Sequence, residues 1–176
     1  MKNAKKILSI LLCLLMLLTL ASCKKEEAKT EEDGEKDGTA AAIAFSITAN
    51  DTTIELGKDA TPVLTALGAP MAQSSVGNCG GKAGTWTRYT YAGFYLLVLE
   101  NGDQQTVDQI ELKDDSILTA KGVGIGSTRD DVLKAYGQGY DKSHSSDTAL
   151  IWRQGNRQLE FYFENGIASA VNFVNK

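Results

Sequence analysis

The sequence predicts an α+β fold built from two tandem repeats, each a short helix packed on an antiparallel β-meander. One set of residues recurs in the same order at a constant offset. The first copy is Leu56-Gly57, Val63-Leu64, Ala66 and Gly68, and the second is Ile125-Gly126, Val132-Leu133, Ala135 and Gly137. A later echo places Leu99-Glu100-Asn101-Gly102 against Phe163-Glu164-Asn165-Gly166. Because self-similarity at a fixed period marks repeated supersecondary units, these matches predict an internal duplication.

Composition and repetition divide the chain into four segments. We expect a signal peptide over residues 1–22 and a charged tether over 23–40. The N-terminal hairpin and the first repeat should cover 41–121, and the second repeat 122–176. The part from residue 41 onward has the length of one ordinary domain.

The first segment has the pattern of an export signal. Three lysines precede an apolar run, Ile7–Leu20, which is shorter than the ~20 residues that a membrane-spanning helix needs. A plain secretory signal is the alternative, but it would end in an Ala-x-Ala type site. Leu20-Ala21-Ser22-Cys23 resembles the lipobox that signal peptidase II cuts. The resemblance implies that Cys23 carries a diacylglyceryl thioether, which anchors the protein to the extracytoplasmic face of a bacterial cell membrane.

The next segment is predicted to be a disordered tether. Lys24–Gly38 is dense in charge and has no large apolar side chain, so it cannot bury enough surface to offset its ordering entropy. A charged helix held by i,i+4 Glu/Lys pairs is the alternative. Gly34 and Gly38 oppose that helix.

A hairpin and a short helix are expected next. Ile43–Thr48 and Thr52–Leu56 should pair around Asn50-Asp51, because Asn and Asp accept the positive φ angles of a tight turn. Asp59 is expected to cap the first helix. Pro62 is tolerated in its first turn because the missing N–H has no intrahelical partner.

The second helix has clearer end signals. Ser127 or Thr128 can cap it, and Asp130 and Asp131 place negative charge at its positive end. Gly137 can take the left-handed conformation that ends it.

Three strands are expected after each helix: Thr85–Tyr91, Phe94–Glu100 and Thr106–Leu112, then Ala149–Gln154, Arg157–Glu164 and Ala168–Val174. Asn101-Gly102 and Asn165-Gly166 are the predicted hairpin turns. Alternation then predicts the inward side chains. They are Tyr91, Tyr95, Leu97, Leu99, Ile110 and Leu112 in the first meander, and Trp152, Leu159, Phe161, Phe163, Val171 and Phe173 in the second.

One patch on the opposite face is more apolar than its counterpart. Trp86, Arg88, Leu96, Val98 and Val107 are expected on the outward face of the first meander, whereas the matching face of the second is polar. Such a patch marks either an interaction surface or a surface covered by the hairpin or the other repeat. The sequence leaves both alternatives open.

No catalytic residue, metal site or cofactor is predicted. His144, the only histidine, lies in a polar loop without the partners that a zinc site needs. Cys79 has no other free thiol for a disulfide and no neighbouring base to activate it. The net charge of −4 disfavours nucleic acid, whose phosphates require Lys and Arg. We therefore expect neither an enzyme nor a nucleic-acid-binding protein.

A helix followed by an antiparallel meander, twice in tandem, resembles the β-lactamase inhibitory protein (BLIP)-like fold. The same fold occurs singly in SmpA/OmlA-type outer-membrane assembly lipoproteins. The residues that carry the resemblance are Ile125-Gly126, Val132-Leu133 and Gly137, with the aromatic strands after them. The whole chain also resembles lipoproteins common in Firmicutes. The resemblance implies a binding scaffold and names no partner.

The sequence thus favours a lipid-anchored protein that binds a partner protein of the cell envelope. The alternative is a receptor for a small molecule or a cell-wall fragment, with Trp86, Tyr89 and Trp152 lining its site. A deep pocket with convergent polar groups would favour the receptor. A broad, partly apolar sheet face would favour the protein partner.

The lipobox makes a direct prediction about anchoring. Cys23→Ala is expected to release the protein from the membrane or to leave it unprocessed, because the variant loses its acylation site. Fractionation of labelled cells measures both outcomes. Normal processing with full membrane retention would contradict the lipobox interpretation.

Overall fold

The computed structural model describes residues 42–77 and 82–176. Its strands are β1 (Ser46–Ala49), β2 (Thr52–Glu55), β3 (Ala72–Val76), β4 (Thr85–Thr90), β5 (Phe94–Asn101), β6 (Gln104–Leu112), β7 (Ala149–Gln154), β8 (Arg157–Glu164) and β9 (Ile167–Asn175), and its helices are α2 (Thr61–Leu67) and α3 (Arg129–Tyr136). The predicted signal segment, Cys23, the tether and Cys79 lie outside the described residues.

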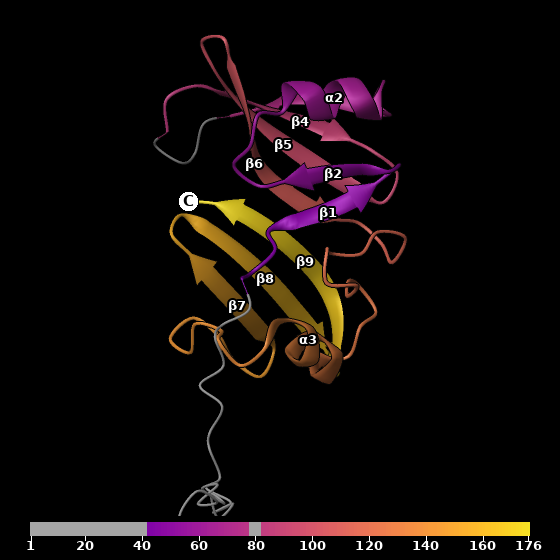
Figure 1. Cartoon of the computed structure of the whole chain (residues 1–176), viewed down its shortest axis with the longest axis vertical. Helices are drawn as coiled ribbons and strands as arrows, with labels where there is room; N and C mark the ends of the chain where they lie inside the picture. The colour runs from indigo at the N-terminus through magenta and orange to yellow at the C-terminus, as the bar shows by residue number, and fades with distance from the viewer. Residues whose placement is uncertain (1–41, 78–81) are drawn as a thin grey trace, which may run out of the picture. The chain divides into compact units, whose positions relative to one another are not determined.

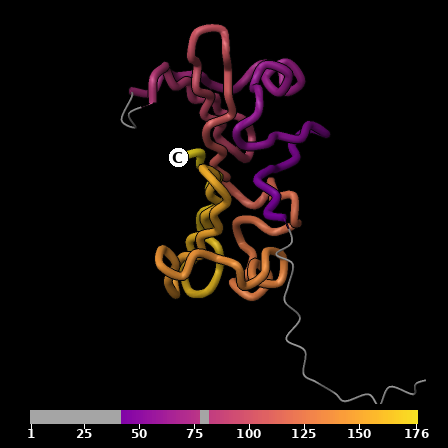
Figure 2. The backbone as a smooth tube through the Cα atoms, turned by 60° about the vertical axis from the view of Figure 1, so that its left-hand side comes forward, coloured from indigo at the N-terminus to yellow at the C-terminus, as the bar shows by residue number. Residues whose placement is uncertain are grey.

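One antiparallel sheet of seven strands, in the order β3-β4-β5-β6-β9-β8-β7, forms the body of the fold. The hairpin β1–β2 and helices α2 and α3 lie on one face of this sheet (Figures 1 and 2). Apolar side chains of the hairpin, the helices and the covered sheet face form one core cluster. The predicted α+β class is therefore confirmed in its coarse form.

The predicted elements occur close to their expected bounds, with one omission. Strand β3 was not predicted, because its residues AQSSV are small or polar and all five are exposed. The hairpin turn is made by Asn50 and Asp51 with φ angles of 48° and 59°, as a type I′ turn requires.

The two helices differ in how their N-termini are capped. Thr128 caps α3 in a reciprocal capping box with Asp131. Helix α2 begins after Ala60, which offers no side-chain cap. Asp59 lies one residue earlier and accepts the Thr61 N–H at 2.9 Å. Asp59 therefore accepts a hydrogen bond from the first turn of the helix, but it lies one residue before the N-cap position.

Strand β6 divides one of its edges between two partners. The Gly57 N–H donates to the Val107 carbonyl at 2.7 Å, and the Val107 N–H donates to the Lys58 carbonyl at 2.9 Å. Further along the same strand, Gln109–Glu111 pairs with β9. The segment after the hairpin and the last strand thus meet β6 on either side of Asp108.

The predicted inward face is confirmed in the second meander and wrong in part of the first. All six residues expected inward in the second meander are buried. In β5, however, Phe94, Leu96 and Val98 are the buried residues, and the expected Tyr95, Leu97 and Leu99 face the other way.

The error comes from the turn. Asn101 pairs with Gln104, so Gly102-Asp103 forms the β5–β6 turn, whereas Asn165-Gly166 forms the β8–β9 turn. Treating the two Asn-Gly pairs as equivalent shifted β5 by one residue. A shift of one residue exchanges the two faces of a strand.

The predicted exposure of Leu96 and Val98 is wrong for the same reason. That of Val107 is wrong because a β-bulge at Asp108 interrupts the alternation of β6. Each of the three is fully buried. They belong to the core cluster that also contains Ile47, Ile54 and Leu56 of the hairpin segment. Of the two alternatives left open by the sequence, a covered surface is the one observed for these residues.

Aromatic rings fill the second half of the core. The Tyr136 ring centroid lies 5.4 Å from that of Trp152 and 5.9 Å from that of Phe161. Burial raises the pKa of Tyr136 to about 12. Helix α3 is therefore held to the sheet by a neutral phenol inside the core.

Val98→Glu is expected to destabilise the fold by several kcal/mol, on the order of 3 or more, because it places an unpaired charge in the core. The matched control is Leu97→Glu, one residue away on the other face, which should cost about 1 kcal/mol. Urea melts measure both losses. Equal losses would mean that the β5 register described here is wrong.

Tyr136→Phe is expected to flatten the alkaline limb of the stability curve. Because the pKa of Tyr136 is raised in the fold, its neutral form is favoured there, and stability is lost as pH rises from about 10 through about 12. For the wild type this loss approaches about 3 kcal/mol. Denaturant melts at pH 8 to 12 compare the two proteins; parallel curves would contradict the assignment.

Candidate functional site

The face of the sheet opposite the helices carries the candidate site. Its outward side chains pair across strands: Trp86 lies opposite Leu99, and Arg88 lies opposite Leu97. Gly84, just before β4, lies against Leu99 and Glu100 and has a φ angle of 128°. A Cβ at Gly84 would clash with the Glu100 carbonyl oxygen, so only glycine allows this close approach.

A cavity of about 560 Å³ opens on this face beside the end of β3. Val76, Trp86 and Leu97 supply apolar lining, whereas Lys82 and Asp108 supply charge. The C-terminal end of β9 closes another side. The volume lies within the range of small-molecule sites and also accommodates a large side chain.

Asp108 enters this cavity because of a β-bulge. Val98 pairs with Val107 and Leu97 pairs with Gln109, so Asp108 has no partner across the ladder. The extra residue lets a carboxylate point to the outer face from a strand whose alternation would direct it elsewhere. In the second meander Ser169 takes the equivalent position, between the pairs Phe163–Ala168 and Tyr162–Ala170.

The Asp108 carboxylate is buried, and each of its two oxygens accepts a hydrogen bond. It is 7% exposed. Its Oδ2 accepts the Trp86 indole N–H at 2.7 Å, and its Oδ1 accepts from the Lys82 ammonium at 2.7 Å. Lys82 also donates to the Asn175 carbonyl. A buried carboxylate with these two donors fixes the Trp86 ring and the Lys82 side chain in one arrangement.

The same face is polar over the second meander. With its amide oriented to satisfy its hydrogen bonds, Gln158 donates to Glu160 at 3.0 Å and accepts from Arg153. The Tyr162 hydroxyl donates to Glu160 at 3.1 Å. Burial, and then the negative charge of Glu160, raise the pKa of Tyr162. Polar and charged side chains thus cover this part of the face, whereas Trp86 and Leu97 line it in the first meander.

Of the five residues predicted for the interaction face, Trp86 and Arg88 lie on this open face and Leu96, Val98 and Val107 do not. Arg88 pairs with Glu111 at 2.8 Å, and its guanidinium lies 4.1 Å from the centroid of the Tyr95 ring.

The predicted aromatic site is not formed. Trp86, Tyr89 and Trp152 were expected to line one receptor site. Tyr89 and Trp152 belong to the core cluster, and only Trp86 lines the cavity on the open face. The structure therefore does not bring the three rings together.

The site residues that sequence reasoning missed are Lys82, Leu97 and Asp108. A signal for the bulge was present in β6. The buried apolar residues Val107 and Ile110 are three positions apart, whereas strict alternation would space them by two or four.

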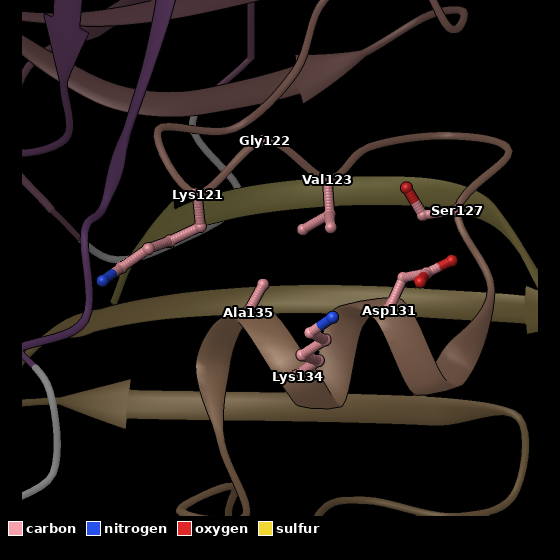
Figure 3. A pocket seen from close by; sticks show the side chains of 7 residues that line it. All are labelled: Lys121, Gly122, Val123, Ser127, Asp131, Lys134 and Ala135. Carbon is pink, nitrogen blue, oxygen red and sulfur yellow. The ribbon is translucent and has the colours of Figure 1, made fainter.

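A second pocket, of about 460 Å³, lies between helix α3 and the loop before it. Figure 3 shows Lys134 and Asp131 on helix α3 and Lys121 on the loop, with the two lysine side chains extending in different directions. Two ammonium groups that do not converge, with a carboxylate beside them, do not make an anion site.

In the polar loop around His144, two neighbouring side chains contact the same ring nitrogen. Ser143 Oγ and Asp141 Oδ2 both contact His144 Nδ1, each at 2.8 Å. A Ser-His-Asp triad instead needs the serine and the carboxylate on opposite ring nitrogens. Within residues 42–77 and 82–176 no group of three metal-ligating side chains occurs. Across the same ranges no helix is long and apolar enough to cross a membrane.

The chain matches no protein-family model and no curated protein sequence. Among solved structures it is similar to a DUF4309 family protein, YjgB, from Bacillus subtilis. The two chains are 18% identical, the match covers 69% of this chain and 82% of that one, and the TM-score is 0.36.

Proposed function

We propose that this protein is a lipid-anchored, extracytoplasmic binding protein that holds a partner protein of the cell envelope on the open face of its sheet. The observation that carries the proposal is the cavity beside Trp86. It combines an apolar wall with a buried Asp108 whose oxygens are paired with Trp86 and Lys82. Interfaces concentrate their binding energy in such pockets, where a large side chain is desolvated.

The anchor is supported by the lipobox at Cys23 and by the charged segment after it. A tether of that composition would hold the domain away from the lipid headgroups, because its acidic residues have no attraction for an anionic surface. This part of the proposal rests on the sequence.

The tandem duplication of BLIP-like repeats belongs to the same proposal. Two features of the sheet support it. In the sheet, the strands of the first meander, β4-β5-β6, are followed by those of the second meander in reverse order, β9-β8-β7. The bulges also fall at matching places, between Leu97 and Val98 in one meander and between Tyr162 and Phe163 in the other. An outer sheet face that binds a partner is the use that this scaffold implies.

A small-molecule or cell-wall-fragment receptor is the second candidate. The cavity volume of about 560 Å³ favours it, since ligand sites commonly have ~300–1,000 Å³. Against it, each Asp108 oxygen already accepts a hydrogen bond, from Lys82 or from Trp86, and the residue is only 7% exposed, so little of the carboxylate is open to a ligand.

Leu97→Glu is expected to reduce partner capture from detergent-solubilised envelopes at least tenfold, or about 1.4 kcal/mol, because the new charge would be desolvated in the interface. Tyr162→Glu is the matched control, since Tyr162 occupies the equivalent bulge position on the same face. It should leave capture unchanged. A urea melt confirms that both variants are folded.

Two results would count against this function. Undiminished capture by Leu97→Glu would remove the cavity from the partner site. Thermal stabilisation of the wild type by purified peptidoglycan fragments, lost in Leu97→Glu and kept in Tyr162→Glu, would instead favour the receptor.

A further inference from the structure

The two edges of the sheet are not alike. At the β7 edge, the preceding loop forms hydrogen bonds with the backbone of the strand. The Asp141 N–H donates to the Ile151 carbonyl at 2.7 Å, and Ser145 Oγ accepts from the Ile151 N–H at 3.0 Å. At the other edge, β3 pairs with β4, and no further strand of the described residues pairs with it. An unpaired strand edge is a template for another strand.

Strand β3 lacks the features that protect natural edge strands. It contains no proline and no charge, and its pairing with β4 runs without a register shift. Apolar side chains are exposed at both ends, since Met71 is 74% and Val76 is 37% exposed. Exposed apolar groups beside an open, regular edge are typical of a strand that receives a partner.

The distribution of charged residues along the chain indicates which partner could pair with β3. Ala60–Gly77 contains no Asp, Glu, Lys, Arg or His, in a chain that is 23% charged and has a net charge of −4. Two copies of such a chain repel each other over most of their surface. The uncharged segment is the place where two copies can approach without opposing like charges.

We infer that β3 pairs with β3 of a second copy of this chain, antiparallel and around a two-fold axis at Ser74. In this register Ala72 lies opposite Val76 of the other copy, and Gln73 lies opposite Ser75. Apolar residues therefore meet apolar residues, and polar residues meet polar ones. Because a five-residue strand buries less than a standard interface of about 1,600 Å², the association is weak and reversible.

The register makes a specific test possible in cells that produce the full chain. Opposite Cα atoms of an antiparallel pair lie ~4.5–5.5 Å apart, within reach of a disulfide. Ser74→Cys should therefore give a reducible dimer on non-reducing gels after mild oxidation, about fivefold above wild type. Ala72→Cys alone should not, because the two copies of residue 72 are offset by four residues, or ~13 Å along the strand.

The complementary pair checks the register itself. Cells that produce Ala72→Cys together with Val76→Cys should form the mixed dimer, although neither variant does so alone. Equal crosslinking at 72, 74 and 76 would indicate random collision and overturn the proposal. Absence of a dimer at 74, or a photocrosslink from position 74 to a different protein, would also overturn it. The wild type carries the same native cysteines and supplies the background.

Discussion

One edge of strand β6 forms backbone hydrogen bonds with two different segments, and the rest of the structure depends on which part of the edge pairs with which segment. Residues near Val107 bond to the segment that follows the hairpin, and Gln109–Glu111 bond to β9. The hairpin is thereby fixed over the first meander, where its apolar side chains complete the core. The second meander is joined to the first through the rest of the same edge. Without this division the two meanders would share no continuous sheet.

The bulge at Asp108 lies where the partner changes, and it creates the candidate site. An ordinary alternating strand would bury this carboxylate in the apolar core, at a cost of several kcal/mol. The extra residue turns it to the other face, where Lys82 and the Trp86 indole pair with it. The equivalent Ser169 has no such partners and bonds only weakly to the Tyr162 carbonyl. One bulge with an acid and one with a serine therefore explain why the two meanders present such different outer faces.

The open face and the open edge differ in chemistry, although they meet at Val76, which ends β3 and lines the cavity. The face offers an apolar cavity beside a buried ion pair, which suits a side chain inserted from a partner. The β3 edge offers unpaired backbone and no charge, which suits another strand. The opposite edge is occupied by the loop before β7, so a sheet extended through β3 ends after one added copy. Because only one edge of the sheet is open, the association stops at a dimer and does not continue into a filament.

The sequence by itself determined the elements other than β3, and the covered face of the second meander. Thr128 with Asp131, Asn50-Asp51 and the alternation around Phe161 act locally, so their structural meaning is visible in a few neighbouring residues. The tertiary structure decided the face of β5, because that face depends on which two residues make the turn with β6. It also decided the site, since Lys82, Trp86 and Asp108 come from different strands or loops and meet only through the bulge and the sheet order. Contacts between distant segments carry no periodic signal, and a shift of one residue is enough to exchange core for surface.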